Sequence, residues 1–207
     1  MSKPVVVIAT HNIHKLKEIK RILKGPFRLK GLDDFLPPYT VRETGKTLEE
    51  NALLKARKAA QWTGCLALSD DTGLEVAALD SRPGVYSARF AGPGCSFEDN
   101  NRKLLRLMRE RKDRGAVFRC AVAAVFPDGR ERLFVGRCPG RIIQSARGAG
   151  GFGYDPVFQP CSSDRTFAEM SIARKNRLSH RAKAFGKAGA FLRRHFRRQR
   201  SGILPVV

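Results

Sequence analysis

Short apolar runs alternate with amphipathic segments along this chain, starting at its first residues. Val5 to Ala9 is a β-branched run that ends at a polar cluster beginning with Thr10. From Leu16 to Leu23 the apolar residues then recur at helical spacing, and Gly25-Pro26 predicts the end of that helix. A buried strand, a polar loop and a helix in this order are typical of the start of an α/β sheet.

Polar residues at capping positions predict where two further helices begin. Thr47 and Glu50 have the spacing of a capping box, and Gly64 predicts the end of the Leu- and Ala-rich helix that follows. Ser96, with Asp99 three residues later, predicts the start of another helix.

The strands are predicted from the remaining apolar runs. Leu66 to Leu68 indicates a short strand that ends at the polar segment 69–73, with Val76 to Leu79 continuing extended. Val117 to Phe126 indicates a long strand, and Pro127-Asp128-Gly129 predicts a turn to a hairpin partner at Leu133 to Val135. With a last helix beginning near Ser179, these elements predict a mixed α/β fold built on one long central sheet.

Composition narrows the class of protein. At 207 residues the chain can bury a core without disulfides, and its five cysteines, with no C-x-x-C pair, favour reduced thiols over a zinc site. Without a membrane-length apolar run or a signal peptide, a cytoplasmic protein is expected. We expect a single domain over residues 1–192 and a basic C-terminal extension over 193–207. The net charge of +21 predicts an anionic partner, a nucleotide or a nucleic acid, unless it reflects an arginine-rich lineage.

Three polar clusters are candidates for chemistry, and the first follows the first strand. Small polar side chains, backbone N–H groups and a lysine at a helix start suit a phosphate cradle, although the Walker spacing is absent. An ordinary helix cap with a solvated lysine is the alternative. The residues of this cluster are Thr10, His11, Asn12, Ile13, His14 and Lys15.

The second cluster is the segment Ser69-Asp70-Asp71-Thr72-Gly73, with Glu43 upstream. Adjacent aspartates after an apolar strand need compensation, and Mg²⁺ favours carboxylate oxygens and water. One carboxylate would then orient or deprotonate an attacking water. A turn that uses aspartate for backbone hydrogen bonds is the alternative.

The third cluster spans Gly150 to Pro156, where glycines surround two aromatic residues. Such glycines permit close approach to a flat ligand on which Phe152 or Tyr154 could stack, and Asp155 could accept hydrogen bonds from a base edge. Lys175, His180 and Arg181 would add donors, although a histidine alone is more often structural.

These motifs together resemble the inosine/xanthosine triphosphate pyrophosphatase family. The resemblance runs in the family's order from Ala9 to Arg181. It is carried by the segments 9–15, 43–52, 69–74, 84–89, 150–158 and 179–181.

The resemblance implies an elongated mixed sheet flanked by helices, with two lobes and a substrate cleft between them. It implies a homodimeric, Mg²⁺-dependent enzyme that splits inosine, deoxyinosine and xanthosine triphosphates into a monophosphate and pyrophosphate. Asp71 would be the general base and a metal ligand, Glu43 a second metal ligand, and Asp70 a reserve carboxylate. Residues 10–15 would hold the triphosphate; the substrate would also meet Thr72, Phe152, Gly153, Tyr154, Asp155, Lys175, His180 and Arg181.

Two other functions remain open at this stage: a pyrophosphatase for other modified nucleotides, and a nucleic-acid-binding protein that uses the positive charge. A substrate panel separates the first, and a steep loss of affinity with salt would indicate the second. Against the second, the sequence shows no helix-turn-helix, RNA-recognition, zinc-finger or KH pattern.

Overall fold

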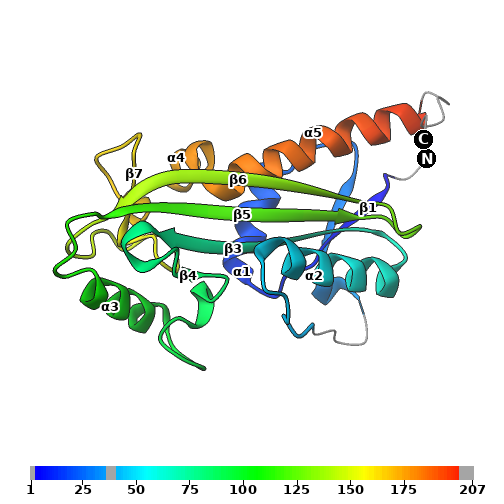
Figure 1. The fold of residues 1–207 in the computed structure, drawn as a ribbon. Coiled ribbons are helices and arrows are strands. Elements are labelled where there is room, and N and C mark those ends of the chain that lie inside the picture. Colours follow the sequence, from blue (N-terminus) through cyan, green and yellow to red (C-terminus); the bar gives the residue numbers. More distant parts are fainter. Residues whose placement is uncertain (1–2, 36–40, 201–207) are drawn as a thin grey trace. The chain divides into compact units, whose positions relative to one another are not determined.

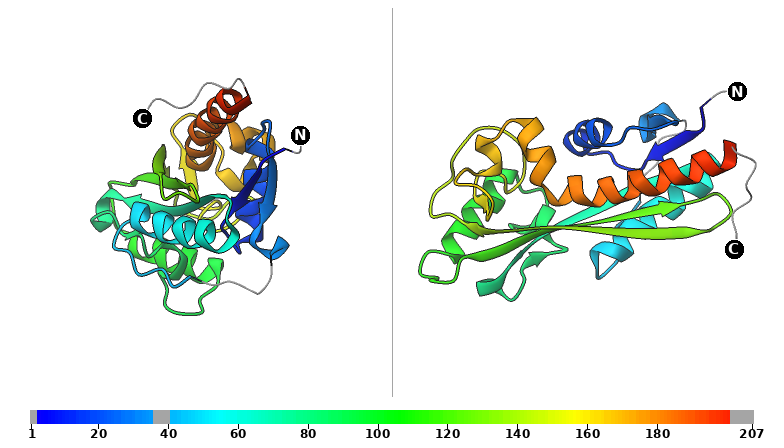
Figure 2. Two further views of the ribbon diagram at one scale, coloured as in Figure 1. Left: turned by 90° about the vertical axis from the view of Figure 1, so that its right-hand side faces the viewer. Right: turned by 90° about the horizontal axis from the view of Figure 1, so that it is seen from above.

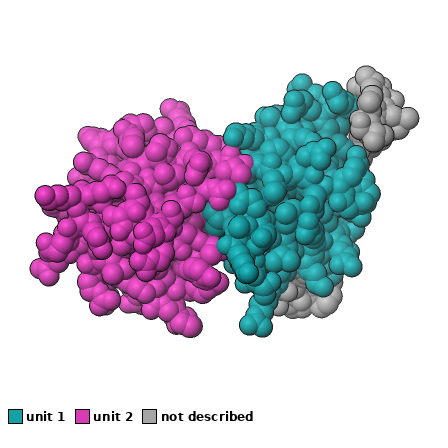
Figure 3. All heavy atoms as spheres, viewed as in Figure 1, with its two compact units in different colours: residues 1–70, 121–134, 184–207 teal, residues 71–120, 135–183 magenta. Residues whose placement is uncertain are grey.

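The structure is a computed structural model that describes residues 3–35 and 41–200. Its contacts separate the chain into two compact units, shown in Figure 3. Unit 1 consists of residues 1–70, 121–134 and 184–207, and unit 2 of residues 71–120 and 135–183. Each unit is therefore assembled from separate stretches of the chain, and no single cut in the sequence divides them.

The fold is a mixed sheet flanked by helices, as the sequence predicts (Figure 1). The hydrogen-bonded strand order is β2-β1-β3-β5-β6-β7, and β4 pairs with β3. The strands are β1 Val5–Ile8, β2 Arg28–Gly31, β3 Leu66–Val76, β4 Pro83–Gly84, β5 Gly115–Val125, β6 Glu131–Ile142 and β7 Phe158–Pro160. The α-helices are α1 Ile13–Ile22, α2 Leu48–Thr63, α3 Phe97–Leu107, α4 Ile172–Leu178 and α5 His180–Arg200.

In unit 1, strand β1 runs parallel to both of its neighbours, β2 and β3. Its apolar run is fully buried at Val6, Val7 and Ile8, because helices cover both faces of the sheet; α2 and α5 lie on opposite sides of it (Figure 2). The predicted capping box of α2 is present, and Gly64 ends the helix with a left-handed φ of 62°. These predictions are confirmed.

In unit 2, the second half of β3 pairs antiparallel with β4, which brings Leu74 opposite Gly84. A Cβ atom on Gly73 would lie 2.5 Å from the Gly84 carbonyl oxygen, so only glycine fits there. Ser87 completes the join, since its Oγ accepts from the Leu74 N–H at 2.9 Å and donates to the Gly84 carbonyl at 2.6 Å. Helix α3 has the predicted capping box at Ser96.

The prediction of a strand end at residues 69–73 is wrong, because β3 continues without a break to Val76. The following residues Ala77–Leu79 form a 3₁₀ turn and are not extended. The strand is paired on both sides of this segment, with β1 at Leu66–Leu68 and with β4 at Leu74 and Glu75, and the two aspartates have partners that compensate for burial. The acidic residues therefore lie inside a strand.

The hairpin and the last helix are present as predicted and are longer than expected. The hairpin turn at 127–129 is present, and its two strands extend over 115–125 and 131–142. Helix α5 begins one residue after Ser179 and continues to Arg200, past the expected start of the extension at residue 193, with Phe196 buried. Within the described residues, no helix is long and apolar enough to cross a membrane.

Candidate functional site

The loop between β1 and α1 places the first cluster in unit 1. Asn12 caps α1, because its Oδ1 accepts from the backbone N–H groups of His14 and Lys15 at 3.0 and 3.1 Å. The Asn12 N–H in turn donates to Thr10 Oγ1 at 3.2 Å. The helix-cap alternative is therefore correct for Asn12, and it fixes the direction in which the helix and its first lysine leave the loop.

Lys15 is not the solvated lysine of that alternative. Its Nζ lies 3.0 Å from Oδ2 of Asp70, and the Asp70 side chain has no exposed surface. The side chain of Lys15 itself is only 15% exposed. A buried carboxylate needs a cation of this kind, so the pair ties the loop after β1 to strand β3.

The other members of the first cluster face the solvent. Ile13 is 53% exposed, and His14 is exposed. The side chain of His11 is 52% exposed, and its Nδ1 lies 3.9 Å from the exposed carboxylate of Asp33. These side chains are open to a ligand, and none of them is part of the packed core.

Glu43 is held by a lysine that the sequence analysis missed. Lys55, on α2, donates from Nζ to Glu43 Oε1 at 2.6 Å and to the backbone carbonyl of Asp70 at 2.8 Å. One ammonium thus joins the loop that carries Glu43 to the strand that carries the aspartates. The available signal was its position, since Lys55 lies between the buried residues Ala52 and Ala56.

The segment around Glu43 is shaped mainly by backbone contacts. The Gly45 N–H donates to Asn51 Oδ1 at 2.8 Å, and a Cβ atom on Gly45 would lie 2.6 Å from that oxygen. Glu50 accepts from the N–H groups of Lys46 and Thr47. The glycine, the asparagine and the second glutamate of this motif therefore build the loop, and Glu43 is the carboxylate that it presents.

Asp71 begins unit 2 and is 8% exposed. Its Oδ1 accepts from the Thr72 N–H at 3.0 Å. Because successive side chains of a strand leave it on opposite faces, Asp70 and Asp71 have different surroundings although they are neighbours. The adjacent aspartates are therefore not interchangeable: Asp70 is locked to Lys15, and Asp71 is the candidate for chemistry.

Unit 2 gathers the third cluster around the ring of Phe152. Lys175 Nζ lies 4.8 Å from the ring centroid and the Arg181 guanidinium carbon 5.4 Å from it. Arg181 also donates from Nη2 to Thr72 Oγ1 at 3.3 Å, so the loop that carries Phe152 and strand β3 meet at this arginine. Two cations against an aromatic face, both buried, form a site suited to a flat, electron-rich ligand.

Asp155 is committed to holding this loop. Its Oδ2 pairs with Lys175 Nζ at 2.5 Å and accepts from the Phe152 N–H at 2.8 Å. Asp155 and Lys175 are both almost fully buried. From α3, Asn101 adds a second tie, donating from Nδ2 to the Gly153 carbonyl at 3.0 Å.

Tyr154 and His180 belong to the packed core of unit 2. Tyr154 is 4% exposed, its hydroxyl donates to the Ser87 carbonyl at 2.9 Å, and burial raises its pKa far above the ordinary value. His180 stacks on Phe118 with ring centroids 4.5 Å apart and an angle of 14° between the planes. The residue that remains for stacking on a ligand is therefore Phe152, which is partly exposed.

The glycines of the third cluster approach the protein itself. Added Cβ atoms at Gly148 and Gly150 would lie 2.5 and 2.9 Å from the backbone of Ala168, and one at Gly151 would collide with the Asp155 carboxylate. Their freedom is used to fold the loop tightly against residues 166–169.

Comparison with known proteins identifies the family. A model of the Ham1 family matches residues 6–191. The chain belongs to the Ham1 family. The matched stretch contains all of the motif segments, from residue 9 to residue 181, and the family membership predicted from the motifs is confirmed.

Relatives and solved structures agree with this. A dITP/XTP pyrophosphatase of Geobacter sulfurreducens is 49% identical over 92% of this chain and 95% of its own length. One from Desulfotalea psychrophila is 44% identical over 90% of this chain and 84% of its own length. The structure of the Staphylococcus aureus Ham1 protein superposes with a TM-score of 0.84 at 40% identity, covering 92% of this chain and 99% of the other.

Proposed function

We propose that this Ham1 chain hydrolyses the link between the α and β phosphates of inosine, deoxyinosine and xanthosine triphosphates, releasing a nucleoside monophosphate and pyrophosphate. The observation that carries the proposal is the buried acidic pair of β3, in which Lys15 neutralises Asp70 and leaves Asp71 as the second carboxylate. The names of relatives that match almost the whole chain support the reaction and the substrates.

The triphosphate is assigned to residues 10–15. It carries about four negative charges, so its binding depends on cations and helix N-termini. Lys15, at the start of α1, supplies the cation, and the exposed positions His11, Ile13 and His14 leave room for a ligand beside it. Because every nucleoside triphosphate has the same phosphates, this segment should contribute equally to all substrates.

The donor set fits Mg²⁺ as the cofactor. No group of three or more metal-ligating side chains occurs among the described residues, which argues against a metal held by protein ligands alone. Mg²⁺ instead binds through one or two carboxylates together with substrate phosphates and waters. Glu43, whose side chain is 34% exposed, and Asp71 would hold it. When bound, the ion would polarise the phosphate and neutralise charge that develops on it.

Asp71 is assigned as the general base that directs and deprotonates the attacking water. Its anchoring through the Thr72 N–H orients the carboxylate. Positioning and electrostatics account for most catalysis in phosphoryl transfer, so a fixed carboxylate is more useful here than a mobile one.

The purine is assigned to unit 2, where Phe152 supplies the stacking surface and Thr72, Gly153, Tyr154, Asp155, Lys175, His180 and Arg181 surround it. A 6-keto oxygen accepts a hydrogen bond, whereas the amino group of adenine cannot. A buried donor that faces the wrong group costs about 1–3 kcal/mol, so two such donors give useful selectivity. Asp155 and Tyr154 act by shaping the loop, because their polar atoms already bind Lys175 and Ser87.

The deciding experiment measures pyrophosphate release from inosine, xanthosine, guanosine and adenosine triphosphates, with and without Mg²⁺. We expect turnover of the first two only, and only with the metal. Asp71→Asn should abolish turnover and keep the melting temperature. Asp80→Asn is the matched control, because it removes a carboxylate that is 93% exposed and has no contact with the assigned residues in the described ion pairs, so turnover should be unchanged. Near-normal turnover in Asp71→Asn would sink the assignment of the base.

We further propose that the enzyme is a homodimer acting on the cytoplasmic nucleotide pool. Light scattering on the purified protein would test the dimer, with a monomer at micromolar concentration as the contrary result.

A further inference from the structure

The outer face of α5 carries basic residues and no acidic ones. Residues 180–200 contain no aspartate or glutamate, although the chain has 19 acidic residues. Lys187, Arg194 and Arg198 are exposed, and their spacing of seven and eleven residues places them within about 40° of one another around the helix. They form a row about 17 Å long, at a rise of about 1.5 Å per residue.

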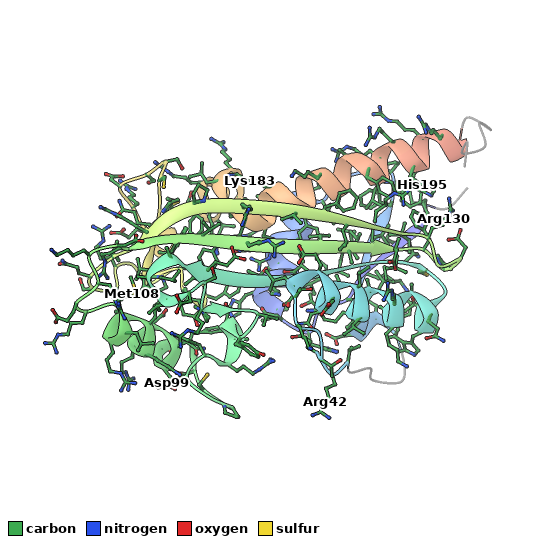
Figure 4. All side chains as sticks on the ribbon, viewed as in Figure 1. Arg42, Asp99, Met108, Arg130, Lys183 and His195 are labelled. Atoms are coloured by element: carbon green, nitrogen blue, oxygen red, sulfur yellow. The ribbon has the colours of Figure 1, made fainter. Side chains whose placement is uncertain are left out.

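Aromatic packing fixes which side of α5 faces outward in unit 1. Phe191 packs against Phe134 with centroids 5.5 Å apart, and Phe196 packs against Phe27 at 5.8 Å. His195 meets Phe126 at 4.8 Å. The fully buried Phe185 and Leu192 and the buried Phe196 mark the inner side of α5, whereas the partly buried Phe191 lies at the border between that side and the cations. Side chains on the outer side of α5 project away from the sheet in Figure 4.

Further cations border this row. Arg132 is exposed and lies on the same side of β6 as Phe134, which packs on α5. On the other border, Arg193 donates to the Lys24 carbonyl at 3.1 Å, which brings the exposed Lys24 beside the helix. We call the set Lys24, Arg132, Lys187, Arg194 and Arg198 the α5 basic face.

The residues between the cations show what kind of partner fits. Gly186 and Ala190 are exposed on one side of the row, the half-buried Phe191 lies on the other, and none of the large hydrophobic residues among the described side chains of α5 is exposed. A helix that binds a membrane surface exposes Trp, Phe or Leu, and a helix that docks in a protein groove exposes apolar anchors. A nucleic-acid backbone needs only a row of cations, and the small residues let it approach closely.

We propose that the α5 basic face binds the phosphate backbone of nucleic acid, independently of sequence. Its length corresponds to about five phosphates along one strand, at about 3.4 Å of helix axis per phosphate. In this proposal the cations contact phosphates and not base edges, so affinity should not depend on the nucleotide sequence. The site is separate from the proposed catalytic residues, and it would hold a nucleotide-cleansing enzyme near nucleic acid.

The test is fluorescence anisotropy with a labelled 20-base-pair duplex, from 50 to 300 mM NaCl and without any nucleoside triphosphate. The variant is Lys187→Gln/Arg194→Gln/Arg198→Gln. Its matched control is Arg102→Gln/Arg106→Gln/Arg109→Gln, which removes the same charge from exposed positions on and beside α3, where Glu98, Asp99 and Glu110 are interspersed. Three lost phosphate contacts should reduce the slope of log affinity against log salt by about 2.7, which is a loss of about five hundredfold in affinity at 0.1 M salt relative to 1 M.

The proposal predicts binding by the wild type, that loss in the α5 variant, and near-normal binding in the control. Equal losses in both variants would mean that only net charge matters and would overturn it. The proposal would also be overturned if the wild type did not bind the duplex at 50 mM salt. It would be overturned as well if the α5 variant lost binding to phosphatidylserine vesicles but not to the duplex. Hydrolysis of inosine triphosphate should be the same in all three proteins. Because the binding assay contains no substrate, failure of the proposed enzyme activity would be seen separately.

Discussion

Replacing Lys15 with methionine should destabilise the protein strongly, because the carboxylate of Asp70 stays buried after its cation is removed. The two charges lie 3.0 Å apart and the Asp70 side chain is fully buried. At an effective dielectric constant of about 20, their attraction is roughly 5 kcal/mol. Breaking one side of a buried pair typically costs about 3–5 kcal/mol. For a chain of this length that corresponds to a fall in melting temperature of roughly 6–20 °C.

The assay is urea denaturation at pH 7, comparing Lys15→Met, Asp70→Asn and the double variant. The double variant should recover most of the loss, because it removes both charges together. Lys17→Met is the control, since Lys17 is exposed on the same helix and should cost less than about 0.5 kcal/mol. A loss below about 1 kcal/mol in Lys15→Met, or a double variant no more stable than the single one, would refute the reasoning.

Three further predictions follow from other contacts. Gly73→Ala should lower the melting temperature by several degrees, since its Cβ would lie 2.5 Å from the Gly84 carbonyl oxygen; an unchanged melting curve would contradict the close β3–β4 approach. His195 has a pKa lowered by burial and by Arg130, so the folded protein binds its proton less well than the unfolded chain does. Its contribution is present above the unfolded pKa and is lost as pH falls below about 6.5, so stability measured from pH 7 to 5 should decline less in His195→Phe than in the wild type. Arg181→Gln should reduce kcat/KM for inosine triphosphate and leave the low kcat/KM for adenosine triphosphate nearly unchanged, so that the ratio of the two falls by about ten- to a hundredfold. An equal reduction for both substrates would indicate that Arg181 binds phosphate.

Local signals were enough to predict where helices and turns begin and end. The capping boxes at Thr47 and Ser96, the stop at Gly64 and the turn at 127–129 depend on neighbouring residues alone, so they can be read from one stretch of sequence. The polar segment after Leu68 misled the same reasoning. Its aspartates and glycine resemble a turn, but strand pairing on either side of it and a lysine from α1 keep it in the strand.

The residues of the site could be predicted from the sequence, but which cation pairs with which carboxylate could not. The motifs selected Lys15, Glu43, Asp155 and Lys175, yet nothing local states which cation meets which carboxylate, because partners such as Lys55 come from distant elements. The role of Tyr154 was equally hidden. Stacking on a ligand and packing in a core both require an aromatic residue, and only the hydroxyl contact across 67 residues to Ser87 distinguishes them.

The lysines paired with the buried or partly buried carboxylates restrict which substitutions the protein can accept during evolution. Arginine outnumbers lysine by 26 to 14 in the chain, yet Asp70, Glu43 and Asp155 are each paired with a lysine. An ammonium is a compact point charge, whereas a guanidinium is a wide planar fork that would need more space in these packed positions. A lineage that exchanges lysine for arginine can do so freely over the surface and is stopped at positions 15, 55 and 175. A library of single lysine-to-arginine exchanges should therefore be tolerated at most of the 14 sites and purged at these three.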